Sequence, residues 1–162
     1  MRTRLRIKSN KSLHDNANAL LSSMYEELIS HSERVLDHPR LKAELHRMRI
    51  VGKPLRYAME IFETAFGEPY ASCFEGIKHL IELMGRVHDH DVTILILRNY
   101  LQEIQFYNKS CENKNERVSP RGIRELIQQR MNRRAVEFNE VCTILKTWQE
   151  ENFRNTLLIS MK

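Results

Sequence analysis

The sequence predicts an all-α protein, a four-helix bundle of long helices, on three observations. Only 5 of the 162 residues are Gly and 4 are Pro, so the chain is poor in the residues that the turns of a many-stranded sheet require. Apolar residues recur at steps of three, four or seven, the period of one helix face, and no stretch alternates as a strand does. A chain of this length supports one core, so we expect one helical domain.

The first two expected helices lie in residues 10–38 and 45–62. In the first, apolar residues follow one helix face, and His31 occupies the one position that the series skips. Pro39 precedes the second helix and suits a first helical turn. Gly67 follows the second helix and is expected to end it.

The third expected helix begins at Tyr70, breaks near Gly85 and then resumes. Residues 107–120 lose the apolar pattern and predict a solvated loop. Ser119 and Pro120 suit the N-cap and first residue of a fourth long helix.

The chain is expected to divide into a basic N-terminal segment (1–11), the helical bundle (12–152) and a C-terminal tail (153–162). No run of 18 apolar residues predicts a membrane span, and the basic start lacks the apolar core of a signal peptide. We therefore expect a cytoplasmic protein with no membrane partner. Its three widely spaced cysteines predict reduced thiols, without a disulfide framework or a zinc site.

Positive charge is concentrated in three stretches of the chain. The net charge is +5 and the sequence pI is about 9.2. Residues 1–11 hold five basic side chains and no acidic one, while residues 40–57 and 117–134 each hold six basic side chains and one acidic one. The rest of the chain is net acidic. This segregation favours a polyanionic partner.

The second expected helix carries a basic stripe, whose members lie within about 80° of one another at 100° per residue. They are His46, Arg49, Lys53 and Arg56. The apolar residues of this helix occupy its other side, so we expect the stripe to face away from the core. It is either a solvated face or, over roughly 15 Å, a row that meets successive phosphates.

Arg134 is an anomaly of the fourth expected helix, because it occupies a position in the apolar series. A charge there needs a partner, since an unpaired buried charge is too costly to keep. One interpretation is a buried ion pair with an acid such as Asp89 or Asp91. The other is an anion ligand.

Two motifs together resemble the CHAD family, the conserved histidine α-helical domain. They are His46-x-x-Arg49-x-x-x-Lys53-x-Leu55-Arg56-Tyr57 and Leu83-Met84-Gly85-Arg86-Val87-His88-Asp89-His90-Asp91-Val92. The family pattern has basic residues three, seven and ten places after a histidine, then a Leu-Gly-x-x-x-Asp-x-Asp-Val-like element, and the resemblance spans roughly residues 44–105. It implies binding of inorganic polyphosphate without catalysis, cofactor or metal, in a channel between two four-helix bundles, and association with polyphosphate granules.

The resemblance also implies roles for individual residues. The expected polyphosphate ligands are His46, Arg49, Lys53, Arg56, Arg86, Arg130 and Arg134. Asp89 and Asp91 are expected to orient these cations or to cap a helix. The chain departs from the family in two ways, since it is long enough for only one bundle, and Gly52 and Pro54 interrupt the first motif. A homodimer would rebuild the channel, and Pro54 is expected to kink the helix.

Three alternative functions remain open. A basic helix stripe also serves nucleic acid, which is therefore expected at least as a competitor, although Tyr57 is the one aromatic residue interleaved with the stripe and a recognition-helix turn is absent. The run from His88 to Asp91 could indicate a metal-dependent HD-type phosphohydrolase, but adjacent helical residues point about 100° apart. A simple protein-interaction bundle is the third.

Overall fold

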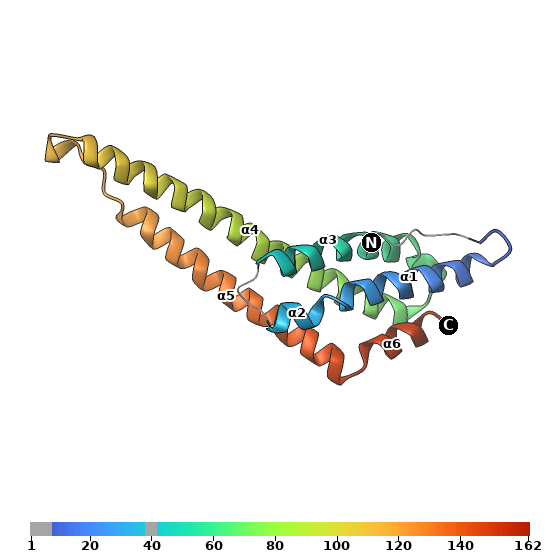
Figure 1. The fold of residues 1–162 in the computed structure, drawn as a ribbon. Coiled ribbons are helices and arrows are strands. Elements are labelled where there is room, and N and C mark those ends of the chain that lie inside the picture. Colours follow the sequence, from blue (N-terminus) through green and yellow to red (C-terminus); the bar gives the residue numbers. More distant parts are fainter. Residues whose placement is uncertain (1–7, 38–41) are drawn as a thin grey trace.

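A computed structural model describes residues 8–37 and 42–162 of the chain (Figure 1). Its helices are α1 (Leu13–Ile29), α2 (Ser32–Asp37), α3 (Lys42–Ile61), α4 (Glu68–Ser110), α5 (Arg121–Glu150) and α6 (Phe153–Ser160), with 3₁₀ helices η1 (Glu63–Ala65) and η2 (Lys114–Glu116). No described residue belongs to a strand, and the all-α prediction is confirmed. Most of the expected basic N-terminal segment, and the expected helix start at Pro39, lie outside the described residues.

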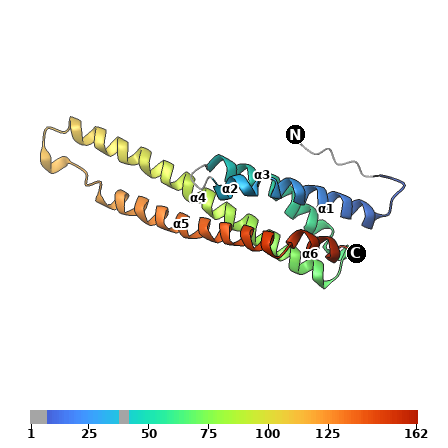
Figure 2. The same cartoon turned by 60° about the horizontal axis from the view of Figure 1, so that its bottom comes forward.

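The long helices α4 and α5 form an antiparallel hairpin, and the other helices pack around one end of it (Figures 1 and 2). The 43 residues of α4 give this helix a length of roughly 65 Å at 1.5 Å per residue. In both views the outer part of the hairpin, toward η2, extends beyond α1, α3 and α6.

The core lies at the bundled end of the hairpin. Leu21, Met48, Ile77, Leu145 and Leu157 come from α1, α3, α4, α5 and α6 in turn, and each is at most 1% exposed. Val35 of α2 is also 1% exposed, so all six α-helices of the described chain contribute fully buried side chains to one hydrophobic cluster. No helix in the described part of the chain is both long and apolar enough to cross a membrane.

The predicted break in the third helix is wrong, because α4 continues through Gly85 without interruption. A glycine in a helix interior costs about 1 kcal/mol relative to alanine, a cost that packing against neighbouring helices offsets. Gly85 lies beside α3, where an added Cβ would stand 3.7 Å from Nε of Arg49.

The first predicted helix is divided in the structure. It ends as α1 at Ile29 and starts again as α2 at Ser32, whose buried hydroxyl donates a hydrogen bond to the Ile29 carbonyl at 2.7 Å. This hydrogen bond satisfies a carbonyl at the end of α1. The apolar spacing continues across the division, so the sequence pattern does not predict it.

The segment that the sequence pattern predicts as a C-terminal tail contains helix α6. Asn152, in the left-handed conformation with φ 51°, turns the chain between α5 and α6. The Phe153 ring then stacks on Trp148 with centroids 4.1 Å apart, and Leu157 and Met161 are buried. At eight residues, α6 is too short to show a clear period.

Candidate functional site

Helix α3 packs closely against α4 and α1 at Gly52. A Cβ added to this buried glycine would lie 3.1 Å from Cγ1 of Ile81 and 3.2 Å from Cδ1 of Leu28. The absent side chain therefore lets three helices approach one another beside the basic residues of α3. The helix continues through Pro54 to Ile61.

Three of the four stripe residues line one pocket between α3 and α4, which we call the basic groove. Its volume is about 210 Å³. It is lined by Arg49, Lys53, Arg56 and Tyr57 of α3 and by Ile81, Glu82 and Gly85 of α4. The three basic residues are half-buried. The stripe therefore borders a neighbouring helix, rather than facing wholly away from the bundle as the periodicity predicts.

Positive charge exceeds negative charge in the basic groove. Nη1 of Arg56 is 3.9 Å from Oε1 of Glu82, and the Arg56 guanidinium lies 4.6 Å from the centroid of the Tyr57 ring. No described carboxylate pairs with Arg49 or Lys53, and the buried Nε of Arg49 has no hydrogen-bond partner among the described residues. An unpaired buried donor is unfavourable, so a bound anion would relieve it.

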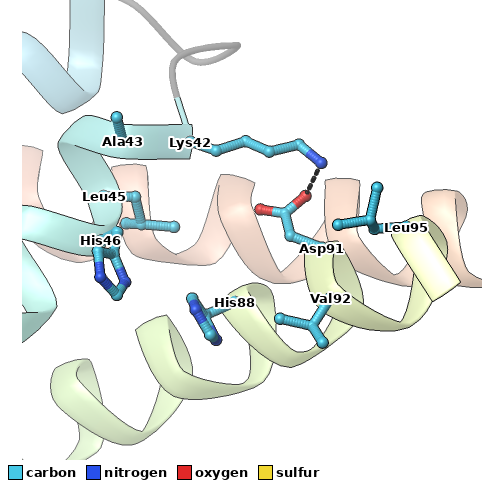
Figure 3. A pocket seen from close by; sticks show the side chains of 8 residues that line it. All are labelled: Lys42, Ala43, Leu45, His46, His88, Asp91, Val92 and Leu95. Carbon is cyan, nitrogen blue, oxygen red and sulfur yellow. Dashed lines mark ion pairs between the residues drawn. The ribbon is translucent and has the colours of Figure 1, made fainter.

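His46, the remaining stripe residue, lines a different pocket at the N-terminal end of α3, which we call the α3-end pocket (Figure 3). The His46 ring stacks on the ring of His88 from α4, with centroids 5.1 Å apart and planes 23° apart. The pocket has a volume of about 470 Å³. Its other lining residues are Lys42, Ala43, Leu45, Asp91, Val92 and Leu95.

Arg134 forms an ion pair with Asp91, one of the two acids that the sequence offered. Its Nε donates to Oδ1 of Asp91 at 2.9 Å, and its Nη2 donates to Oδ2 at 3.3 Å. Lys42 Nζ approaches the same Oδ1 at 2.7 Å, the contact drawn in Figure 3. Asp91 therefore connects α3, α4 and α5, and the ion-pair interpretation of Arg134 is confirmed.

The other predicted site residues lie outside the basic groove. Nε of Arg86 is 3.3 Å from Oε1 of Glu137 on α5, whose Oε2 is 3.2 Å from Nε2 of the buried His90. Arg130 is half-buried on α5 and pairs with no described carboxylate. Asp89 is exposed, with Oδ1 3.5 Å from Nδ1 of His88.

Glu82 and His88 line the two pockets, although the sequence pattern predicts neither of them as a residue of the polyphosphate site. Ile81, Gly85 and His88 follow one another at steps of four and three, so they share the face of α4 that meets α3. That spacing was available in the sequence. The sequence does not show which helix covers this face.

Metal-ligating and thiol groups are dispersed in the described part of the chain. No group of three or more His, Cys, Asp or Glu side chains there is placed to hold a metal ion. Cys73, Cys111 and Cys142 are free thiols, and burial raises the pKa of Cys73 and of Cys142.

The comparison with protein families identifies a match that covers more than half of the chain. The family model described as CHAD domain matches residues 2–98. This range includes α1, α2, α3 and most of α4, and therefore the whole basic groove, whereas Arg130 and Arg134 of α5 lie beyond it. No curated protein and no solved structure matches the chain.

Proposed function

We propose that this chain, which belongs to the CHAD domain family, binds inorganic polyphosphate without catalysing a reaction on it. The observation that supports the proposal best is the excess of positive charge in the basic groove. Arg49, Lys53 and Arg56 line the pocket together with one carboxylate, Glu82. Membership of the CHAD domain family supports a polyphosphate-related role for these basic side chains.

The basic groove suits a linear polyanion. Arg49 and Arg56 lie two turns apart, so their backbone positions are separated by roughly 10 Å along α3, with Lys53 between them. An extended chain of phosphates can meet the three side chains in succession. The arginines offer forked donors to phosphate oxygens, and lysine offers a mobile point charge.

The other predicted ligands have different roles in this proposal. His46 extends the row by one turn toward the α3-end pocket. Arg86 and Arg134 engage Glu137 and Asp91, so they hold helices in position, and Arg130 contributes to the electrostatic field. Binding in one chain needs no second copy. A channel lined by two copies stays a prediction.

Nucleic acid is the second candidate ligand, and Tyr57 is the observation that favours it. This exposed ring lies beside Arg56 at the edge of the basic groove, where an unpaired base could stack on it. Phosphodiesters and polyphosphate would use the same cations. Competition between the two anions distinguishes them.

Charge reversal in the basic groove tests the proposal directly. We expect the combined substitutions Lys53→Glu and Arg56→Glu to weaken binding of long-chain polyphosphate at least tenfold at physiological salt. The matched control carries Arg124→Glu and Arg133→Glu on exposed positions of α5, with the same change in net charge, and should bind nearly as the wild type does. Isothermal titration calorimetry measures both, and circular dichroism checks helicity.

Two outcomes would contradict the polyphosphate proposal. Equal losses of affinity in the groove variant and the control would show that binding depends on net charge alone. Unchanged affinity of the groove variant would show that polyphosphate does not bind in the basic groove. Displacement of polyphosphate by equimolar single-stranded or duplex nucleic acid would favour the second candidate. A chain that binds polyphosphate selectively is expected to accumulate on polyphosphate granules in cells that form them.

A further inference from the structure

The outer half of α4 carries an apolar face that no described helix covers. Six large apolar side chains make up this outer α4 face, and each is between 41% and 77% exposed. They are Val92, Leu95, Ile96, Tyr100, Phe106 and Tyr107. At 100° per residue they fall within an arc of about 140°, and Glu103 is the one charged residue in that arc.

The same part of α4 is also apolar on its opposite side, where it packs against α5. Ile94 is buried there, and Leu97, Leu101 and Ile104 are half-buried. Of the helices that the structure describes, Figures 1 and 2 show only α5 beside this part of α4. A surface helix is ordinarily apolar on one side, so two apolar sides are typical of a helix with a partner on each.

The outer α4 face continues an interface that already exists within the chain. Toward the N-terminus of α4, the same side of the helix carries Ile81, Gly85 and His88, and α3 covers it. Among the described residues, this coverage ends where α3 begins, at Lys42. The α3-end pocket lies at this boundary, and its wall includes Val92 and Leu95, the first two residues of the uncovered face (Figure 3).

We propose that a second copy of this chain covers the outer α4 face, with the two α4 helices antiparallel and a two-fold axis near Asn99 and Tyr100. Val92 and Tyr107 are equally distant from that axis along the helix. The pairing therefore places Phe106 and Tyr107 of one copy against the α3-end pocket of the other. At 77%, Phe106 is the most exposed large apolar side chain among the described residues.

The face complements itself, which favours a second copy over an unrelated partner. One end presents a projecting ring and the other an open pocket of about 470 Å³, so a two-fold arrangement fills both pockets at once. Taking about 200 Å² for an aromatic side chain, the three rings expose on the order of 350 Å² per copy. With the aliphatic residues, two copies would bury on the order of 1,200 Å², the lower limit for a stable interface.

The proposed dimer does not depend on the proposed function. Antiparallel pairing about this axis places the two basic grooves, at the level of Ile81 to Gly85, roughly 50 Å apart along the helices. The grooves therefore do not merge, so this dimer differs from the one that would form a channel between two copies. Loss of polyphosphate binding and loss of the dimer should come from different substitutions.

Sedimentation of the full chain tests the interface. We expect the wild type to change from monomer to dimer as its concentration rises through the micromolar range. Ile96→Glu together with Tyr100→Glu should weaken the dimer at least tenfold. Leu126→Glu together with Val136→Glu, a control on exposed positions of α5, should leave it unchanged.

A wild type that stays monomeric up to millimolar concentration would overturn the proposal and assign the face to another partner. The proposal would also be overturned if the variant with Ile96→Glu and Tyr100→Glu formed dimers as tightly as the wild type. Because the substituted side chains are exposed, circular dichroism should show unchanged helicity. Polyphosphate binding by the monomeric variant should also persist, so the two proposals fail independently.

Cysteine crosslinking tests the register in a Cys111→Ser background. Asn99→Cys lies beside the axis, so its two copies should form a disulfide under mild oxidation. The two copies of Phe106→Cys would lie roughly 20 Å apart along the helices, too far for a bond. Crosslinking of Phe106→Cys but not of Asn99→Cys would overturn the proposed axis.

Discussion

Asp91 is the side chain at which three helices meet. It accepts two hydrogen bonds from Arg134 of α5, and Lys42 of α3 approaches the same carboxylate. The Asp91 side chain is 11% exposed and that of Arg134 is 17% exposed, so water solvates this pair poorly. Each ion depends on the other for its stabilisation, because removing one partner leaves a charge in a largely desolvated position.

Asp91→Ala is expected to lower the free energy of unfolding by about 2 kcal/mol, less than a fully buried pair would lose because this one is partly exposed. Urea denaturation measures the change. The control is Asp89→Ala, at an exposed position two residues earlier, which should change stability by less than about 0.5 kcal/mol. Equal effects of the two substitutions would show that the contacts of Asp91 contribute no more than an exposed charge.

Arg134 itself distinguishes a structural role from a ligand role. Arg134→Met leaves Asp91 near Lys42, and we expect lower stability with an affinity for polyphosphate within about twofold of the wild type. Arg134 engages Asp91 and does not line the basic groove. A tenfold loss of affinity in a folded Arg134→Met variant would restore the ligand role that the family resemblance implies.

At the scale of the element, α3 contains two residues that weaken isolated helices, Gly52 and Pro54. Gly52 has a packing reason, since the backbone of α3 comes close to Ile81 of α4 and Leu28 of α1 at that position. This approach places Arg49 and Lys53 against α4, where they form the basic groove. The close packing of the helices at Gly52 therefore helps to form the basic groove.

Gly52→Val should lower the free energy of unfolding by about 1–3 kcal/mol, because it overpacks a close contact between three helices. Thermal denaturation measures the loss. Gly122→Ala is the matched control, since an added Cβ at that position of α5 meets nothing within 4 Å. The control should keep or slightly raise stability. A Gly52→Val variant as stable as the wild type would mean that the helices separate at little cost.

At the scale of the whole molecule, α6 brings the end of the chain back onto its beginning. The Asn18 side chain of α1 donates a hydrogen bond to the Met161 carbonyl at 3.4 Å, and Arg154 pairs with Glu26. Leu157 and Met161 belong to the hydrophobic core cluster, as do residues of α5. The core therefore needs helices beyond residue 98, where the family match ends.

Leu157→Ala should lower the free energy of unfolding by about 2–4 kcal/mol, because it leaves a cavity at a fully buried position. Ile159→Ala, on the exposed side of the same helix, is the control and should change stability little. Chemical denaturation of both variants measures the difference. If the two substitutions cost the same, α6 does not contribute to the core in solution.

The sequence by itself determined most of the helical residues and which of them share a face, but not helix α6 or the division between α1 and α2. Apolar spacing is a local property, and it was enough to predict the four long helices and to place Arg49, Lys53 and Arg56 on one side of α3. The positive charge of that side was also predictable, because it follows from the residue types alone. What covers each face is not a local property.

Only the tertiary structure decided which helices meet. Packing carries α4 through Gly85, and the fold brings Asp91 rather than Asp89 to Arg134. The stacking of His46 on His88 likewise separates His46 from the basic groove. In each case the outcome depends on contacts between residues far apart in the chain, and their free energy outweighs the local preferences that a sequence pattern records.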